Sequence, residues 1–413
     1  MNDFTTLFLI ALGTSFLIQF WLSRRQAAHV ARHRGSVPLE FRERISPEAH
    51  ARAADYTLEK LKLGEFDRLL GLGLLLILTL GGGIRGLQDF WESFDLGDIT
   101  RGVGLILSTF LILQLFELPL TLYQTFRIEA RYGFNKTTPI QFLKDLLLQG
   151  LLGLLIGGGL LALILWVMTT AGPTWWLLAW GILMAFSVLM SWAYPTLIAP
   201  LFNRFSPLPD APLRQRIEGL LSRCGFKSQG IFVMDGSKRS GHGNAYFTGL
   251  GDSKRIVFFD TLVDALDHDE LEAVLAHELG HFRCRHVIKM LLASALLNLA
   301  GLALLGWLSH ELWFFEGLGG VSPAPESALL LFILISPILT TALKPVMAHF
   351  QRRFEFEADA FAAGHTQAAH LVSALVKLYR DNASTLTPDP LYAAFHYSHP
   401  PATIRIAHLN QTA

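Results

Sequence analysis

Residues 146–169 read LLLQGLLGLLIGGGLLALILWVMT, and none of these side chains is charged. A helix needs about 20 mostly apolar residues to cross the hydrocarbon core of a bilayer, so this segment predicts a membrane-spanning helix. The composition of the whole chain agrees, because Asp, Glu, Lys and Arg make up only 16% of its 413 residues and the mean hydropathy is +0.38. An average protein has about 25% charged residues. The same composition excludes a disordered or fibrous chain.

Six further stretches are similarly long and apolar, and we predict seven spans in all. The other six cover residues 4–22, 69–86, 103–123, 174–199, 287–308 and 328–348. Glu117 lies inside the third span. A carboxylate in that position indicates either a functional group at a wet cavity or a hydrogen bond between packed helices. The sequence therefore predicts an α-helical integral membrane protein.

The charged residues between the spans predict the orientation of the chain. No basic residue precedes the first span and Arg24 and Arg25 follow it, so we expect an uncleaved helix there, not a signal peptide. The loops after spans one and three are basic, whereas those after spans two and six are mainly acidic. Basic loops stay in the cytoplasm. We therefore expect a protein of the cell inner membrane, with its N-terminus on the outer side. The polar regions 200–286 and 349–413 would then lie in the cytoplasm.

These features divide the chain into four parts. We expect a five-span N-terminal region (1–199), a cytoplasmic part (200–286), a transmembrane hairpin (287–348) and a second cytoplasmic part (349–413). The 34 basic residues balance the 34 acidic ones, which argues against a nucleic-acid partner. The two cysteines, Cys224 and Cys284, are too few for a disulfide framework and are expected to be reduced.

The first cytoplasmic part contains a metal-binding pattern. Residues 268–284 read HDELEAVLAHELGHFRC, in which acidic N-cap candidates precede helix-forming residues. On that helix His277 and His281 are four residues apart and share one face, and two neutral imidazoles so placed can bind Zn²⁺. Glu278 then lies beside them, ready to take a proton from the attacking water. Taken alone, the pattern also fits a helix with two surface histidines.

A third ligand is available in the second cytoplasmic part. Catalytic zinc commonly binds two histidines and one glutamate and keeps a fourth position for water. Residues 351–362 read QRRFEFEADAFA, where Glu355 and Asp359 share a helix face and Glu357 points elsewhere. We expect Glu355 to bind the metal and Asp359 to accept a hydrogen bond from a ligand histidine. The alternative is a charged helix face exposed to solvent. We consider it the weaker interpretation, because the transmembrane hairpin between the two motifs returns the second to the same side of the membrane as the first.

These motifs resemble those of the type I CAAX prenyl endopeptidases, the integral-membrane zinc proteases that cleave prenylated proteins, and of their bacterial relatives. The resemblance covers most of the chain. Its most specific parts are HELGH at 277–281, EFEADAF at 355–361, NAYF at 244–247, SHPP at 398–401 with Arg405, and RYGFNKTT at 131–138. No lysine-rich retrieval tail is evident in the sequence, and we expect a bacterial member of the family.

The resemblance implies a fold and a set of roles. The family's fold is a ring of seven transmembrane helices around a water-filled chamber, with a zincin-like metalloprotease domain and its small β-sheet near the cytosolic side. Zinc would be held by His277, His281 and Glu355, with Glu278 as the general base. His399 and Arg405 would lie beside the metal, where a donor can stabilise the tetrahedral oxyanion.

The resemblance also implies how a substrate is held. Residues 230–234, 245–250 and 255–259 look like short strands separated by Gly and Asp turns. The second would be an edge strand that pairs with the substrate backbone, mainly through main-chain hydrogen bonds. Its substrate-binding residues would be Asn244, Ala245, Tyr246 and Phe247. Three departures from the family pattern leave the substrate preference open: Gly243 for Ser, Phe282 for Trp and Glu357 for Gln.

The sequence therefore predicts a membrane-embedded zinc endopeptidase that cleaves near the C-terminus of prenylated or hydrophobic peptides. A quality-control protease that clears damaged membrane proteins would use the same site. A seven-helix receptor or transporter with a vestigial metal site is the third interpretation, which the near-complete set of ligands opposes. The natural substrate and the oligomeric state are left open by the sequence.

Overall fold

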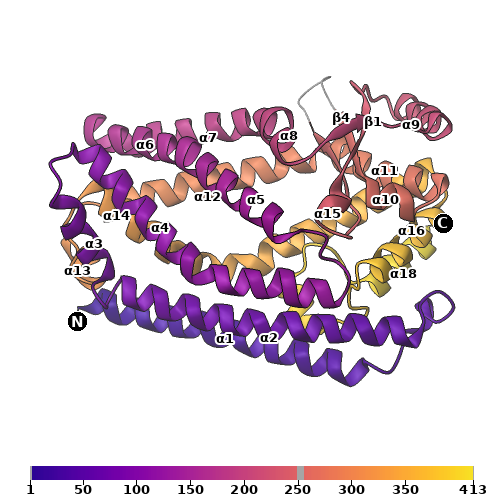
Figure 1. Ribbon diagram of the computed structural model, residues 1–413, viewed down its shortest axis with the longest axis horizontal. Helices are drawn as coiled ribbons and strands as arrows, with labels where there is room; N and C mark the ends of the chain where they lie inside the picture. The colour runs from indigo at the N-terminus through magenta and orange to yellow at the C-terminus, as the bar shows by residue number, and fades with distance from the viewer. Residues whose placement is uncertain (1, 249–254, 413) are drawn as a thin grey trace.

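The computed structural model describes residues 2–248 and 255–412. Long helices run along most of the molecule, and a small sheet with shorter helices forms one end of it (Figure 1). The helices before the sheet are α1 (Asp3–His33), α2 (Pro47–Leu78), α3 (Gly83–Glu92), α4 (Asp98–Tyr123), α5 (Pro139–Leu152), α6 (Gly158–Thr170), α7 (Trp175–Ala193) and α8 (Ala199–Phe202). The sheet region contains β1 (Phe205–Pro207), α9 (Ala211–Arg223), β2 (Ile231–Met234), β3 (Ala245–Thr248), β4 (Arg255–Phe259), α10 (Asp260–Ala265) and α11 (His268–Arg283). It is followed by α12 (His286–Leu308), α13 (Leu312–Gly317), α14 (Pro325–Thr340), α15 (Lys344–His365), α16 (Ala368–Asp381), α17 (Pro390–His396) and α18 (Ala402–Thr412).

Six helical segments within the described ranges are long and apolar enough to cross a membrane. A seventh crossing arises if α2 and α3, which are bent by 53° at their junction, count as one span. The second span is not the continuous helix expected over 69–86, and that prediction was wrong. α2 ends at Leu78, and Gly82 has a φ of 78° just before α3 begins. Glycine adopts this conformation without steric conflict, and an apolar sequence does not reveal such a break.

The last predicted span, 328–348, also differs from the structure. α14 ends at Thr340, a short 3₁₀ turn follows, and α15 then continues from Lys344 to His365. α15 therefore carries the chain out of the apolar region. It brings residues 355–359 to the end of the molecule that contains the sheet.

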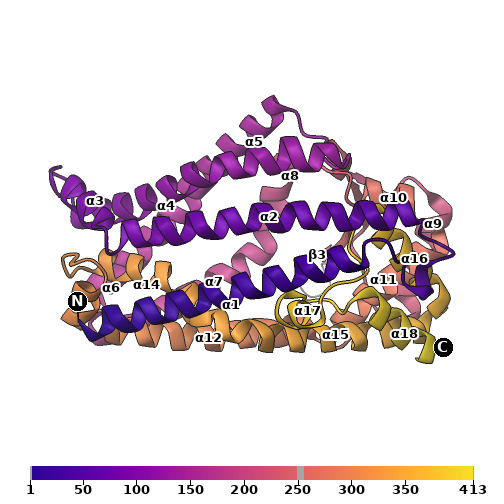
Figure 2. The same cartoon turned by 90° about the horizontal axis from the view of Figure 1, so that it is seen from below.

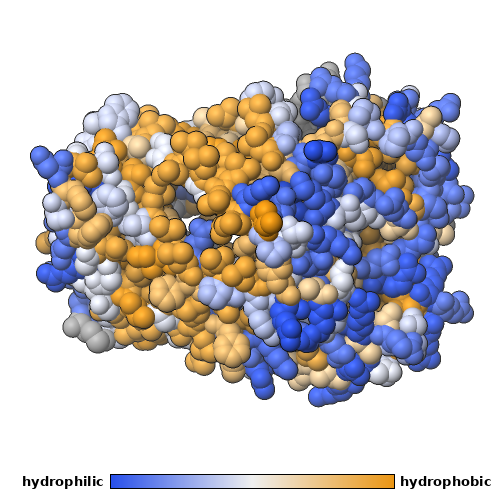
Figure 3. Space-filling model, viewed as in Figure 1, coloured by the Kyte–Doolittle hydropathy of each residue, from blue (hydrophilic) through white to orange (hydrophobic). Residues whose placement is uncertain are grey.

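Apolar and polar surfaces are separated along the long axis of the molecule. Figure 3 shows apolar side chains over the long helices and polar ones gathered at the end that contains the sheet, α9, α11, α16 and α18. Leu17, Leu154 and Leu296 are among the apolar side chains that are more than half exposed. Such a surface matches one that faces lipid. Glu117 is also exposed, on α4, so its side chain is not buried in a contact between helices.

Three apolar cores are found among the described residues, and the two larger ones hold the molecule together. One lies between the spanning helices and includes Ile106, Leu165 and Leu330. The other includes Phe258 and Leu275 and packs the sheet against α9, α11, α16 and α18. The metal-binding pattern of α11 belongs to this second core, so its histidines are held by the packed polar end and not by a loop.

The polar end contains a sheet of four strands, counted over the described residues, in the order β1-β2-β4-β3. β2 and β4 are parallel, and β1 and β3 flank them in antiparallel pairs. The three predicted strands are confirmed, except that residues 249 and 250 of the second lie outside the described residues. β1 was not predicted. β3 is an outer strand of this sheet, which is the position expected for a strand that pairs with a peptide.

The first helix is tied to the C-terminal part of the chain. Arg25 of α1 makes a two-pronged ion pair with Asp389 at 2.9 and 3.3 Å, and Asp389 caps the N-terminus of α17. The backbone N–H of Asp389 also donates to the side chain of Gln26 (2.7 Å). Accordingly, α17 lies beside α1 in Figure 2. These contacts fix the segment that leads to His399 relative to the spanning helices.

Candidate active site

The histidine pair is positioned by the start and the packing of α11. Asp267 accepts a hydrogen bond from the N–H of Glu270 (2.9 Å), whose carboxylate accepts one from the N–H of Asp267 (3.0 Å). This capping box satisfies two of the free amides at the start of a helix. The opposite face of α11 is buried, with Leu275 and Leu279 in the core. His277 and His281 therefore project from a helix whose rotation is fixed.

Three donor groups converge on one point between α11 and α15. The Nε2 atoms of His277 and His281 are 3.2 Å apart. Glu355 of α15 places Oε1 3.3 Å from the Nε2 of His281 and Oε2 3.6 Å from the Nε2 of His277. Glu355 is 5% exposed, and its Oε2 has no hydrogen-bond partner among the described residues, although the Nη1 of Arg405 lies 3.3 Å away. Such a buried acceptor is costly unless another group binds it.

The spacing of these atoms fits a small tetrahedral cation. With bonds of 2.0–2.1 Å and tetrahedral angles, two ligand atoms of zinc lie roughly 3.3–3.4 Å apart. The Nε2 atoms of the two histidines are 3.2 Å apart, one oxygen of Glu355 lies 3.3 Å from His281, and its other oxygen lies 3.6 Å from His277, so all contacts are close to this spacing. Two imidazoles and one carboxylate also match the ligand set of catalytic zinc sites. The structure thus brings together the three predicted ligands in an arrangement that can hold the metal.

A close approach between the two helices makes this geometry possible. A Cβ atom at Gly280 would lie 2.8 Å from the Cα of Ala358 and 3.0 Å from its carbonyl oxygen. Both neighbours are backbone atoms, which cannot rotate away as a long side chain can. Gly280, between the two histidines, therefore lets α11 contact α15 at the distance at which Glu355 reaches the metal position.

Asp359 and Arg405 form a buried ion pair behind the first histidine. Arg405 of α18 donates to both carboxylate oxygens of Asp359, from Nε at 2.7 Å and from Nη2 at 2.6 Å. Asp359 is fully buried and its Oδ1 lies 2.8 Å from the Nδ1 of His277. A hydrogen bond there places the ring proton on Nδ1, so that the lone pair of the Nε2 of His277 is available to the metal position, although the Nη2 of Arg405 also lies 3.2 Å from this atom. Asp359 thus lies beside His277, one of the two histidines predicted to bind the metal.

The protonation of the site follows from its burial. Burial, reinforced by the charge of Arg405, lowers the pKa of His277 to about 4, so the imidazole is neutral at physiological pH and can bind a cation. Burial raises the pKa of Glu278 to about 7. A carboxylate with a pKa near the working pH can both accept and return a proton.

His399 faces the same carboxylate from the C-terminal segment. Its Nε2 lies 3.4 Å from Oε1 of Glu355, and its side chain is 64% exposed. His399 and Arg405 line a cavity of about 830 Å³ between α1, α2, α16 and α17. The metal position therefore lies beside a space large enough for a peptide. A second cavity, of about 670 Å³, is bordered by Pro400 and Pro401.

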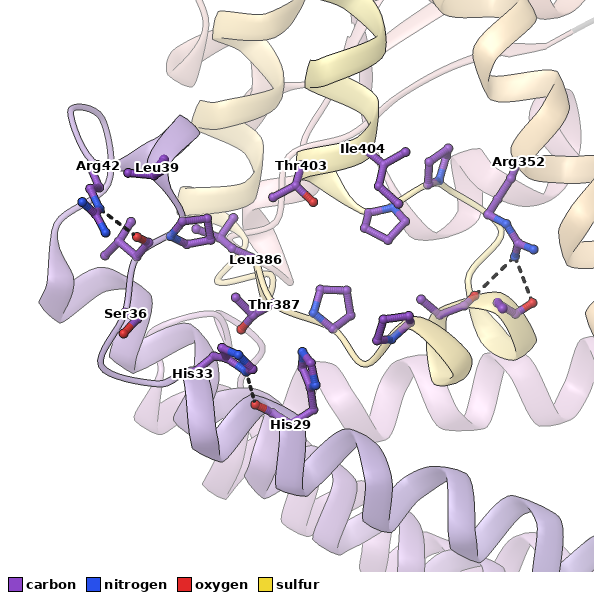
Figure 4. Close-up of a pocket in the computed structure, with 18 of the residues that line it drawn as sticks. His29, His33, Ser36, Leu39, Arg42, Arg352, Leu386, Thr387, Thr403 and Ile404 are labelled. Carbon is purple, nitrogen blue, oxygen red and sulfur yellow. Dashed lines mark hydrogen bonds between the residues drawn. The ribbon is translucent and has the colours of Figure 1, made fainter.

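Arg352 braces the turn that carries His399. Its Nη1 donates to the carbonyl oxygens of Ala394 (3.1 Å) and Tyr397 (2.8 Å). Figure 4 shows the guanidinium of Arg352 reaching carbonyl oxygens at the end of the short helix α17, on the wall of the second cavity. His399, two residues after Tyr397, is thus held by α15, the helix that also carries Glu355.

The edge strand β3 lies beside the end of α11. The rings of Phe247 and Phe282 meet edge to face at 5.2 Å between centroids. The N–H of Phe259 donates to the carbonyl of Asn244. Bonded and non-bonded pairs alternate along an antiparallel ladder, so the backbone groups of Ala245 and Phe247 point away from β4, toward the outer edge.

One buried neighbour of the site, His286, was not predicted from the sequence. His286, the first residue of α12, is 3% exposed, and its Nδ1 lies 2.9 Å from the Nδ1 of His281. It follows the metal-binding pattern by only five residues, but at a spacing that places it on no common helix face. A polar residue at the start of an apolar span was the signal that could have drawn attention to it.

Comparisons with known proteins place the chain in a family. A family model for "CAAX prenyl protease N-terminal, five membrane helices" matches residues 26–204, and one for "Peptidase family M48" matches residues 207–413. A rice (Oryza sativa subsp. japonica) "CAAX prenyl protease 1 homolog" is 36% identical over 411 residues, which cover 95% of this chain and 94% of that protein. The chain belongs to the CAAX prenyl protease 1 family.

Two further comparisons support the assignment to the CAAX prenyl protease 1 family. The "CAAX prenyl protease 1" of Saccharomyces cerevisiae is 38% identical over 315 residues, or 72% of this chain and 69% of that protein. The crystal structure of S. mikatae Ste24p matches with a TM-score of 0.91 and 29% identity over 99% of this chain and 100% of that one. The chain is thus an integral-membrane metalloprotease of peptidase family M48 that acts on peptides. Membership of a protease family excludes the receptor or transporter interpretation.

Proposed function

We propose that this metalloprotease uses zinc to cleave peptide bonds near the C-terminus of prenylated or hydrophobic peptides. The observation that supports the metal is the convergence of two imidazole nitrogens and the buried carboxylate of Glu355 within 3.2–3.6 Å of one another, with one carboxylate oxygen that lacks a hydrogen bond. When bound by His277, His281 and Glu355, zinc would polarise the scissile carbonyl and lower the pKa of a water molecule. Asp359 keeps His277 in the tautomer that this binding requires.

Glu278 is the proposed proton carrier. It lies next to His277 on α11, and its raised pKa of about 7 suits a group that takes a proton from the attacking water. The same carboxyl group then delivers that proton to the leaving amine. His399, exposed toward the cavity, is the proposed donor to the oxyanion. Arg405 is occupied by Asp359, and we assign it a positioning role in place of the donor role first expected.

The cavity suggests how a C-terminal peptide is recognised. Lys60 and Arg68 of α2 line it together with His399. The Nε and Nη2 atoms of Arg68 are buried and have no hydrogen-bond partner among the described residues. A free carboxylate at the end of a peptide would offset the cost of burying these donors. The cavity therefore favours substrates that end close to the cleaved bond.

The proposed orientation follows from the charges of the loops. The polar end, which carries the metal site, lies on the same side of the spanning helices as the basic loops after spans one and three. The positive-inside rule then places it in the cytoplasm and the N-terminus outside, in a cell inner membrane. We also propose that the chain is divided into the four parts predicted from the sequence, with boundaries after residues 199, 286 and 348.

Cleavage of a farnesylated CAAX peptide by the purified protein tests the function. We expect cleavage that a chelator abolishes and zinc restores, with a higher kcat/KM than for the same peptide without the lipid. Amidation of the peptide C-terminus should raise KM. Cleavage that survives removal of all metal contradicts the mechanism. Equal kcat/KM for lipidated and plain peptides contradicts the prenylated substrate and favours the quality-control alternative.

Proline at position 247 tests the edge strand. The N–H of Phe247 points to the outer edge, where proline is tolerated in a sheet. We expect Phe247→Pro to remove one main-chain hydrogen bond to the substrate and raise KM by about 3- to 10-fold, with little change in kcat. Phe247→Ala is the matched control, because it removes the same ring but keeps the N–H. Equal KM values for the two variants would show that β3 does not bind the peptide backbone.

A further inference from the structure

A chain of hydrogen bonds leads from the metal position to the surface. The Nδ1 of His281 lies 2.9 Å from the Nδ1 of His286, and the Nε2 of His286 lies 3.0 Å from Oε2 of Glu357. His286 is buried and stacks on Phe354 of α15, with ring centroids 4.2 Å apart and planes 13° apart. Both hydrogen-bonding atoms of this imidazole are thus engaged, and its ring plane is fixed.

Only one arrangement of protons satisfies this chain when His281 binds a cation. Ligation through Nε2, the atom that faces His277 and Glu355, leaves the proton of His281 on Nδ1. That N–H must then donate to the Nδ1 of His286. His286 in turn carries its proton on Nε2 and donates it to the carboxylate of Glu357, which can only accept.

We propose that His286 and Glu357 are positioning residues that fix the tautomer and ring orientation of His281. The carboxylate of Glu357 orients His286, and His286 in turn orients His281, the metal ligand. The inference rests on the proposed metal site. It gives the two ligand histidines separate supports: Asp359 acts directly on His277, and Glu357 acts on His281 through His286. Carboxylates behind ligand histidines raise ligand basicity and metal affinity.

The backbone between α11 and α12 is shaped for this contact. Arg285 has φ 57° and ψ 34°, in the left-handed region. A residue other than glycine adopts this conformation at a cost of about 1–3 kcal/mol, so the surrounding structure must favour it. The turn starts α12 at His286 and directs its ring back toward His281.

A second metal ion is the rival explanation for these side chains. Cys284, His286 and Glu357 also offer ligand atoms within 4.8 Å of one another. However, Nζ of Lys289 and Nε of Arg353 each lie 3.6 Å from the carboxylate of Glu357. These two cations neutralise the carboxylate and disfavour a further positive charge beside it. The hydrogen-bonded arrangement is therefore preferred.

Zinc affinity measured by competition with a chelator tests the proposal, without reference to peptide cleavage. We expect His286→Phe, which keeps a ring against Phe354, and Glu357→Leu to weaken zinc binding by about 10- to 100-fold. Glu357→Gln keeps an acceptor oxygen and should restore most of the affinity. Cys284→Ala and Lys289→Gln are the controls, because each changes a neighbour of the two proposed positioning residues but leaves their hydrogen bonds in place.

The outcomes separate this inference from the proposed function. The midpoint of thermal unfolding of the metal-free variants should match that of the parent, because the proposed contacts act on the metal ligand. Glu357 is partly exposed, so its variants test the proposal even if His286→Phe fails to fold. Unchanged zinc affinity in Glu357→Leu overturns the inference. So does a second bound zinc that Cys284→Ala removes. A parent protein that binds no zinc overturns the proposed function itself.

Discussion

Replacing Glu278 with Gln is expected to lower kcat/KM by about 10²- to 10⁴-fold, the usual contribution of a general acid–base group. Gln has nearly the same shape but cannot accept a proton at neutral pH. Glu278 belongs to the site but is not one of the three converging ligands, so the variant should bind zinc as tightly as the parent. Cleavage rate and metal content, measured on the same preparation, check both parts of the expectation.

The matched control is Glu272→Gln on the same helix. Glu272 makes ion pairs with Arg216 and Arg223 at the surface, and such pairs contribute about 0–1 kcal/mol. This variant should therefore keep its activity. A Glu278→Gln protein that still cleaves at the parent rate would contradict the proposed mechanism. A variant that has lost its metal would instead show that Glu278 holds the site together.

Arg405→Leu is expected to destabilise the polar end by about 3–5 kcal/mol, because it leaves a buried charge without its partner. Arg405 is 6% exposed, and the carboxylates that it faces, Asp359 and Glu355, are 0% and 5% exposed. The midpoint of thermal unfolding of the metal-free protein should fall accordingly. Arg405→Lys should recover only part of the loss, since an ammonium group cannot make the two-pronged contact with Asp359.

A double variant separates stability from metal binding. In Arg405→Leu with Asp359→Leu the unpaired carboxylate is gone, and apolar replacements of buried ion pairs are often well tolerated. We expect the unfolding midpoint to rise above that of Arg405→Leu alone, while zinc affinity stays low because His277 has lost its acceptor. A double variant less stable than the sum of the two single changes would contradict the assignment of Asp359 and Arg405 as one ion pair.

Features with a local signal were predictable from the sequence. The apolar stretches are recognisable by their length, the strands by the Gly and Asp turns between them, and the histidine pair by its spacing of four residues. The break between Leu78 and Gly83 has no such signal, because it depends on backbone angles. The strand β1 is only three residues long and contains a proline, so it too lacked a recognisable pattern.

The support of the site could be predicted only in part. The sequence could place Asp359 near Glu355 because it lies one helical turn away. The pairing of Arg405 with Asp359 spans 46 residues, and that of His286 with Glu357 spans 71. Contacts between segments so far apart depend on how the helices pack, and a single sequence does not contain that information. The occupied donors of Arg405 are a consequence of the same packing.

The position of the hairpin α12–α14 between α11 and α15 determines when the proposed metal site can form during synthesis. A ribosome exposes His277 and His281 before the hairpin is made, and Glu355 only after it. A half-made chain therefore offers two imidazoles without the carboxylate, and it binds a metal much more weakly than the finished protein. Peptide cleavage can begin only once the last spanning helix has been made.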